Sequence, residues 1–548
     1  MQHQASPVDW TMRSFFRSGG PGGLHLGMFL MALFQSWGGS LLLVQGQTVT
    51  KDLLAKRLYG KSSSMCAILY DDSLKCWGTN VNGQLGYGDT TNRGGTPTSV
   101  GDSLPAVNVG TGLTVKSVCS PPASGSHRCA ILNNGKVKCW GTNSFGQLGL
   151  GLATTVKLGD AAGEMGDALS FVSLGTNTSA PGSPEYTAKQ VVCGVDFTCA
   201  LLSNDMVKCW GRSLRLGLML STGNIGDAAG EMGNNLGFVD LGTGKTVKSI
   251  NAGSDFVCAH LSDNTVKCWG GNSFGQLGLG VTTTNIGSTA GSMGNSLNPV
   301  DFGTGRTVKK ISAGKQTSCV ILDNDQVKCW GVSSDGTLGD GGLSDGSTGN
   351  SPSEMGDNLL PVNLGTGDVP VDISNGDSNA CVRLQSNQVK CWGNCVNMGI
   401  GTCLDGVIGF DADTMGDALV AVDFGTGLTG KSMALGAGFI CSVLNNNRVK
   451  CWGGQTAKGE TLSGGSATDF SQGPATVPTA ALGTIQCSAG SNSVPCRQCP
   501  TPTFWLASAG SCSACAVGGY YVDPSTSCTA CPSGYQSVQV CCRHLLAF

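Results

Sequence analysis

Short apolar stretches separated by polar turns recur through most of the chain, and seven of them carry the pattern Cys-x9-Cys-Trp-Gly. In every copy Leu stands three positions after the first cysteine, and Leu or Val stands eight positions after it. Two apolar runs around a polar centre predict a β-hairpin. Pairing the two cysteines across the strands leaves a three-residue loop, whose last residue is Asp72, Gly135, Asp205, Asn264, Asp325, Asn387 or Asn447. These residue types tolerate the left-handed backbone that this position requires, so the turn chemistry supports the register independently of the cysteines.

The hairpins repeat with a period of about 62 residues, because six steps separate Cys76 from Cys451. Between them a second segment recurs, in which Met-Gly-Asp or Met-Gly-Asn leads through an apolar stretch to Gly-Thr. It begins at Met165, Met232, Met293, Met355 and Met415, with a divergent copy at Val100. Self-similarity at a fixed period is typical of a repeat architecture.

The hairpin register also predicts the cysteine pairing. Each pair lies at a site without cross-strand hydrogen bonds, where Cα atoms approach to about 4.5 Å, a distance that a disulfide bridges. We therefore predict seven disulfides, which join Cys66 to Cys76, Cys129 to Cys139, Cys199 to Cys209, Cys258 to Cys268, Cys319 to Cys329, Cys381 to Cys391 and Cys441 to Cys451. The alternative is that these cysteines are reduced, buried thiols.

Composition excludes one class of function and favours one compartment. The 548 residues include 33 basic and 36 acidic residues, for a formal net charge of −3. A nucleic-acid binder needs many clustered Lys and Arg, so this class is excluded. The 85 Gly suit short strands joined by tight turns, and 27 Cys are too many for an ordinary protein of a reducing compartment.

Residues 1–46 are predicted to be a signal peptide or a signal anchor. Arg13 and Arg17 precede a stretch, 24–46, that lacks charged residues and ends in small residues near Gly46. The stretch is long enough to span a bilayer, but polar residues around Gln35 weaken it, which favours cleavage over anchoring. In either case we expect the protein to be secreted or to lie on the extracellular face of the membrane. The sequon at Asn177 predicts glycosylation there.

Three copies of Asn-x-x-Gly-Gln-Leu-Gly, at 80–86, 143–149 and 272–278, follow their hairpins closely. Together the two elements resemble the repeat of the regulator of chromosome condensation, and the cysteine-paired form is similar to the extracellular subtype of crinkly-type plant receptor kinases. The resemblance implies an all-β fold, a seven-bladed β-propeller over residues 48–482. Residues 48–65 would supply the inner strands of the first blade, and 477–482 would close the ring.

This sequence departs from the resemblance in two ways. The Asn-x-x-Gly-Gln-Leu-Gly motif is degraded at 212–217, 333–339 and 394–400. The Met-Gly segments lengthen each repeat, and we expect them to form loops on one face of the ring. The loops at 159–167, 226–234, 287–295 and 340–357 are then candidates for a partner-binding surface, the alternative being ordinary extended connections.

The composition changes at residue 487, and 487–548 is predicted to be a small disulfide-rich module. Cys-x2-Cys recurs at Cys496, Cys512 and Cys528, every 16 residues. A structural zinc site would fit this spacing, but the extracellular context favours disulfides. The segments around Tyr520 and Tyr535 resemble cysteine-rich modules of the ephrin-receptor and tumour-necrosis-receptor type.

Four further cysteines lie outside the hairpins. Cys119 and Cys193 occupy what look like equivalent positions before the second and third hairpins, and they form either a bond between blades or a pair of buried thiols. Cys395 and Cys403 are close enough in sequence to pair locally.

Two other residue types recur once per repeat. The tryptophans after the second cysteines would form either an aromatic binding ring or, as we favour, the packing between blades. They are Trp77, Trp140, Trp210, Trp269, Trp330, Trp392 and Trp452. The lysines before those cysteines would form either a cationic band or, as we favour, a solvated strand face. They are Lys75, Lys138, Lys208, Lys267, Lys328, Lys390 and Lys450.

No motif in the sequence predicts an enzyme, a cofactor or a resident metal. The five His have no catalytic context, and the Gly-rich runs lack the Lys of a phosphate-binding loop. The acidic loops 340–357 and 411–417 match no known calcium loop, and solvated turns explain them better. The sequence therefore favours a binding scaffold that recognises a protein or a glycan through propeller loops. Nucleotide exchange on a small GTPase is the alternative, which the family resemblance alone suggests.

Overall fold

The computed structural model describes residues 54–94, 101–177, 182–281, 283–342, 346–395 and 406–453, together with the backbone of a few short strands outside these ranges. The signal segment 1–46, the ring-closing segment 477–482 and the cysteine pairing of the module at 487–548 lie outside the described residues. Among the residues that the structure describes, none of the helices is long and apolar enough to cross a membrane.

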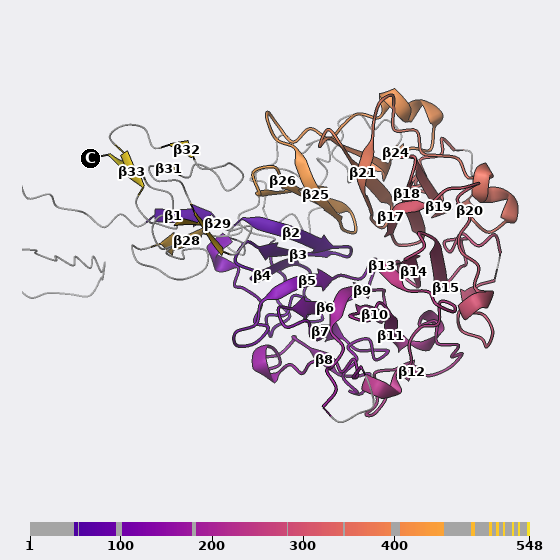
Figure 1. The fold of residues 1–548 in the computed structure, drawn as a ribbon, viewed down its shortest axis with the longest axis horizontal. Coiled ribbons are helices and arrows are strands. Elements are labelled where there is room, and N and C mark those ends of the chain that lie inside the picture. The colour runs from indigo at the N-terminus through magenta and orange to yellow at the C-terminus, as the bar shows by residue number, and fades with distance from the viewer. Residues whose placement is uncertain are drawn as a thin grey trace, which may run out of the picture. The chain divides into compact units, whose positions relative to one another are not determined.

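Seven antiparallel sheets of three or four strands succeed one another along the chain, and each contains one Cys-x9-Cys hairpin. We number them as blades 1 to 7 (Figure 1). The first strands are β2 (Ala55–Gly60), β5 (Val115–Cys119), β9 (Ala188–Cys193), β13 (Val247–Ala252), β17 (Val308–Ala313), β21 (Pro370–Asn375) and β25 (Gly430–Leu435). The second strands are β3 (Ser64–Leu69), β6 (His127–Leu132), β10 (Phe197–Leu202), β14 (Phe256–Leu261), β18 (Thr317–Leu322), β22 (Asn379–Leu384) and β26 (Phe439–Leu444).

The third strands complete the hairpins, and a two-residue fourth strand follows in blades 2 to 6. The third strands are β4 (Leu74–Gly78), β7 (Val137–Thr142), β11 (Val207–Arg212), β15 (Val266–Gly271), β19 (Val327–Val332), β23 (Val389–Asn394) and β27 (Val449–Gly453). The fourth strands are β8 (Lys157–Leu158), β12 (Asn224–Ile225), β16 (Asn285–Ile286), β20 (Ser347–Thr348) and β24 (Val407–Ile408). Outside the blades, β1 (Val49–Asp52) pairs with β28 (Thr484–Cys487).

The blades form a closed ring, because the first strand of each blade contacts the first strand of the next, including β25 of blade 7 with β2 of blade 1. Two backbone hydrogen bonds join these two blades, from Ala55 N to Asn447 O at 2.9 Å and from Ala437 N to Ser62 O at 3.3 Å. The first strands therefore surround the centre of the ring, which we call the channel (Figure 1). The predicted seven-bladed β-propeller is confirmed.

The hairpin register agrees with the prediction in all seven blades. Each cysteine pair is directly opposite, as Cys258 is to Cys268, and each is bonded, with Cα atoms 4.0 to 4.1 Å apart. The last loop residue is left-handed throughout, with φ between 60° and 67° at the Asp and Asn residues and 77° at Gly135. The backbone also requires a glycine after the tryptophan. Gly141 has a φ of 99°, and a Cβ there would collide with the backbone of Ser126 and His127.

The core lies between the blades. Cys139 and Trp140 are neighbours on one strand, so they face opposite sides of blade 2. On one side the disulfide packs with Trp210 of blade 3, and on the other Trp140 packs with the Cys66–Cys76 disulfide of blade 1. The same pairing of a disulfide with the next blade's tryptophan recurs around the ring. The Cys-Trp-Gly motif thus supplies both halves of every blade interface.

The Met-Gly segments interrupt the fourth strand at the outer edge of each blade. In blade 2 the chain passes from β8 into the segment and then returns to the same edge, where Val172 N donates to Val137 O at 2.8 Å. The segments form 3-10 turns at the periphery of the ring (Figure 1). These turns are η2 (Gly101–Ser103), η3 (Gly166–Ala168), η5 (Gly233–Asn235), η6 (Gly294–Ser296), η7 (Pro352–Glu354), η8 (Gly356–Asn358), η10 (Ala412–Thr414) and η11 (Gly416–Ala418). The expectation that these loops gather on one face is wrong, because they lie on the outer strand edges.

Candidate functional site

The seven tryptophans pack between blades, so the aromatic binding ring is excluded. All are at most 1% exposed. In at least four of them the indole Nε1 donates to a described backbone carbonyl of the preceding blade: Trp140 to Gln84 O at 3.1 Å, Trp210 to Gln147 O at 3.0 Å, Trp330 to Gln276 O at 3.0 Å and Trp392 to Thr337 O at 2.8 Å. These acceptors lie in the Asn-x-x-Gly-Gln-Leu-Gly loops or their degraded copies, which explains why that motif recurs.

The seven lysines are neither a cationic band nor a solvated face, and both interpretations from sequence are wrong. All are buried, with exposed fractions of 2% to 8%. Lys208 Nζ donates to Leu174 O at 3.1 Å and to Gly233 O at 2.7 Å, and Lys138, Lys267 and Lys328 make the same two kinds of bond. Each of these four ammonium groups thus joins the end of one Met-Gly segment and the start of the next to its own hairpin. Burial lowers the pKa of Lys208.

The Met-Gly segments are held by bonds that a sequence reading missed. Glu164 Oε2 accepts from the backbone nitrogens of Gly159, Asp160 and Ala161 at 2.8, 3.1 and 3.0 Å, and Glu231 and Glu354 do the same in blades 3 and 5. The Asp or Asn of the motif then bonds to the preceding repeat, as Asp167 accepts from Thr111 N at 2.8 Å and Thr111 Oγ1 at 2.6 Å. These segments are therefore part of the blade-to-blade framework, and shortening them would damage the ring.

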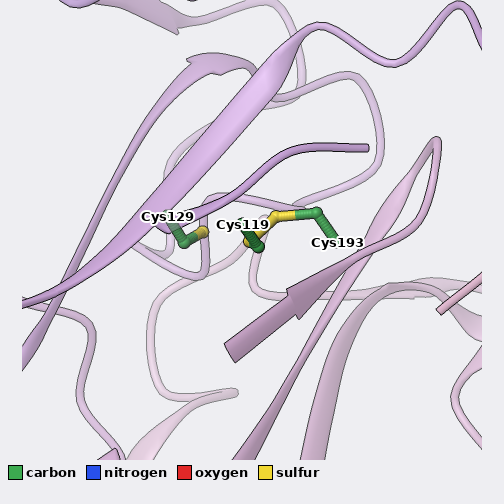
Figure 2. Close-up of side chains that lie close together, drawn as sticks. All are labelled: Cys119, Cys129 and Cys193. Atoms are coloured by element: carbon green, nitrogen blue, oxygen red, sulfur yellow. A yellow bond between two sulfur atoms is a disulfide. The ribbon is translucent and has the colours of Figure 1, made fainter. Parts of the chain in front are cut away.

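Cys119 and Cys193 form a disulfide between blades 2 and 3, with Cα atoms 5.5 Å apart (Figure 2). They are not at equivalent positions. Cys119 pairs with Cys129 across its sheet, whereas Val192 and not Cys193 is opposite Cys199. Adjacent residues of a strand point to opposite faces, so this offset of one residue turns the two cysteines toward each other. Cys129 Sγ completes a group of three sulfurs within 4.8 Å, but all three are in disulfides, which leaves no thiolate for a metal.

Cys395 is buried, and its suggested partner Cys403 lies outside the described residues. Asn177 is exposed, as a glycosylation site requires, and its backbone nitrogen donates to Pro184 O at 3.0 Å. Residues 178–181, which include the rest of the sequon, are outside the described part of the chain.

The channel has two ends. The hairpin end carries the loops between second and third strands, and the loop end carries the turns between first and second strands. Departures from the repeat gather at the loop end. The turn there has three residues in six blades, but in blade 2 residues 120–126 form a longer loop. Ala123 N in this loop donates to Asp377 Oδ1 of blade 6 at 3.1 Å. Blades 2 and 6 are not neighbours, so the loop reaches across the channel mouth.

Lys61 of blade 1 crosses the same mouth. Its Nζ donates to Ala252 O of blade 4 at 2.9 Å and to Ala313 O of blade 5 at 2.6 Å. Burial lowers the pKa of Lys61 to about 8, and the charge of Asp377 opposes this shift. Burial also raises the pKa of Asp377, against the bond from Ala123 and the charges of Lys315 and Lys61. The loop end is therefore closed by polar groups from opposite sides of the ring.

A second departure lies beside it, between blades 3 and 4. The degraded motif of blade 3 folds as the 3-10 turn η4 (Ser213–Arg215). Arg212 bonds to the buried Asp196 at 3.1 Å and lies over the ring of Phe145 at 5.0 Å. Arg215 lies 3.6 Å from Asp255. Burial raises the pKa of Asp196, and its Oδ1 has no partner among the described residues.

We take the groups around Phe145, Asp196, Arg212, Arg215 and Asp255 as the candidate site. One exposed apolar side chain flanks it on the same end of the ring, since Phe274 is 38% exposed. Arg is enriched among the residues that dominate protein interfaces, which makes this cluster the candidate for protein recognition. Sequence reasoning noted the degraded 212–217 segment but not its role. Two departures from the repeat length could have indicated the site: the loop at 120–126 is longer than its counterparts, and the motif of blade 3 is shorter.

Comparison with known proteins agrees with the fold. The model of the regulator of chromosome condensation (RCC1) repeat matches residues 118–147, 188–215, 247–276 and 308–337, in blades 2 to 5. The blades are RCC1-like repeats. The ultraviolet-B receptor UVR8 of Arabidopsis thaliana is 25% identical over 292 residues, 52% of this chain and 55% of UVR8. The mitochondrial RCC1 domain-containing protein RUG3 of the same plant is 22% identical over 414 residues, 72% of this chain and 80% of RUG3.

This chain thus spans about half the length of UVR8, and 5% of the human E3 ubiquitin-protein ligase HERC2, to which it is 23% identical over 277 residues. Among solved structures, yeast RCC1 (Prp20) bound to Kap60 has a TM-score of 0.49 at 17% identity and covers 79% of this chain and 86% of its own. The ectodomain of the Arabidopsis thaliana receptor kinase ACR4 has a TM-score of 0.38 at 19% identity and covers 73% and 96%.

Proposed function

We propose that this chain is an extracellular scaffold that binds a protein partner through the loop end of its propeller. The observation that carries the proposal is the cluster of Phe145, Asp196, Arg212, Arg215 and Asp255. Its two arginines come from the degraded motif of blade 3, where the sequence departs from the repeat. Each blade is already held by its disulfide, tryptophan and lysine. Binding residues commonly lie on irregular loops that a rigid scaffold holds in place, and this ring provides such a scaffold.

The disulfides support the extracellular part of the proposal. Eight bonds are present among the described residues, one in each hairpin and one between blades 2 and 3. Such bonds persist in oxidising compartments and are rare in the cytosol. Nucleotide exchange on a small GTPase, the alternative function, takes place in the cytosol and is therefore the weaker candidate.

Binding should depend on the loop end. With the propeller as bait for extracellular material, Phe145→Ser together with Arg212→Glu should reduce capture of the specific partner about tenfold or more, because buried aromatic and Arg contacts dominate protein interfaces. The matched control is Phe410→Ser, which changes a side chain that is 46% exposed at the outer edge of blade 6. The control should melt at the wild-type temperature, whereas the double variant should stay folded but melt lower, because it removes the cation that pairs with the buried Asp196. Equal capture by the two variants would contradict the assignment of the site.

A further inference from the structure

A ring of exposed lysines lies at the opposite, hairpin end of the channel. Six of the seven first strands have Lys as their second residue, and blade 6 has Val371 there. The lysines are Lys56, Lys116, Lys189, Lys248, Lys309 and Lys431, and all are exposed. The pairing of each first strand with its second shifts register at this residue, as between Val247 and Ser249. Because neighbouring first strands contact one another around the whole ring, the strand ends that carry these lysines encircle one end of the channel.

Hydrogen bonds hold five of the six side chains toward the hairpins. The acceptor is the side chain of the left-handed loop residue of the same blade: Lys56 bonds to Asp72 at 2.7 Å, Lys189 to Asp205 at 2.6 Å, Lys309 to Asp325 at 2.6 Å, Lys431 to Asn447 at 2.7 Å, and Lys248 to Asn264. Blade 2 has Gly135 at the acceptor position. Within the described part of the chain, Lys116 accordingly has no hydrogen-bond or ion-pair partner.

Local ion pairing does not account for these lysines. Exposed ion pairs contribute little to stability. In blades 4 and 7 the acceptor is an uncharged Asn, and in blade 2 the lysine is present without an acceptor. The charges of Lys116, Lys248 and Lys431 are therefore not neutralised by the loop residue of their own blade.

The opening is positively charged although the chain carries a net charge of −3. Arg57 and Lys310, the next residues of β2 and β17, add to the six lysines. The carboxylates that pair with this set are Asp72, Asp205, Asp325 and Asp372, the last bonded to Lys310. The cations outnumber these carboxylates by four. Such a concentration of one sign attracts anions.

We propose that the hairpin end of the channel binds a sulfated glycan. Ammonium groups at regular positions around an opening suit a ligand with several separated sulfates, each of which accepts from one lysine. Ser117, Ser249 and Ser432 follow three of the lysines and offer hydroxyls to sugar oxygens. Sulfated glycans are extracellular, so this inference rests on the proposed compartment, but it concerns the other end of the ring from the protein-binding site.

Heparin is the probe for the test. The triple variant Lys116→Ala, Lys248→Ala and Lys431→Ala should bind heparin about tenfold or more weakly at physiological salt, with a shallower salt dependence. The control removes exposed cations away from the hairpin end, Lys157 in β8 and Lys315 in the loop-end turn of blade 5, each to Ala, and should bind as the wild type does. Equal binding by the triple variant, or an equal loss in the control, would overturn the proposal.

Two further probes separate the ligand classes. Heparin should compete better than polyglutamate and better than inositol hexakisphosphate at equal charge concentration. Stronger competition by either would reassign the opening to acidic peptides or to small polyphosphates and overturn the glycan assignment. The Phe145 and Arg212 variant should retain full heparin binding, so failure here is distinguishable from failure of the protein-binding site.

Discussion

Replacing Trp269 with Ala should lower the free energy of unfolding by about 3–5 kcal/mol, the usual cost of removing a fully buried large aromatic side chain. Trp269 is 0% exposed and packs between blades 3 and 4. Denaturant unfolding under oxidising conditions, which keep the disulfides intact, measures the change. An unchanged midpoint together with lost partner binding would contradict the packing role.

Replacement by Phe gives a sharper comparison between two blades. Trp140 Nε1 donates to Gln84 O, whereas Trp269 Nε1 has no partner among the described residues, because the shortened motif of blade 3 supplies no acceptor. Trp140→Phe leaves a buried carbonyl unpaired and should cost about 1–3 kcal/mol more than Trp269→Phe. Equal costs at the two positions would show that the indole bond contributes nothing.

Lys208→Met should destabilise the protein by about 2–4 kcal/mol, since it leaves Leu174 O and Gly233 O buried without a donor. The control is Lys189→Met in the same blade, whose side chain is 46% exposed and which should change stability little. An unchanged melting temperature for Lys208→Met would mean that relief of the buried charge offsets the lost bonds, and would contradict their stabilising role.

The pH dependence of stability checks the same lysine. Burial lowers the pKa of Lys208 in the folded state from its ordinary value of 10.5. The unfolded chain therefore holds more protons than the folded one just below pH 10.5, and the free energy of unfolding should rise with pH in that window. Lys208→Met should show a smaller rise than the wild type.

Short-range patterns in the sequence predicted most of the fold. The left-handed loop residues and the cysteine spacing determine the hairpin, and a hairpin repeated seven times determines the blade count. What the sequence did not reveal depends on contacts between repeats. Lys208 looks like a surface residue by strand alternation, and it is buried only because the Met-Gly segments of its own and the preceding repeat fold back on it.

The candidate site was harder to predict for the same reason. The bond from Ala123 to Asp377 joins residues of blades 2 and 6, and Lys61 reaches carbonyls of blades 4 and 5. No periodicity encodes such contacts, because they exist only when the ring closes. The offset between Cys119 and Cys193 was likewise hidden by the longer loop of blade 2, which shifts the spacing from Cys119 to the hairpin.

Peptide mapping without reduction, on protein isolated from its native compartment, tests the central claim most directly. An oxidised extracellular propeller predicts linked peptides for all seven hairpin pairs, such as Cys258 with Cys268, and for Cys119 with Cys193. Recovery of these cysteines as free thiols would contradict both the disulfide framework and the extracellular assignment.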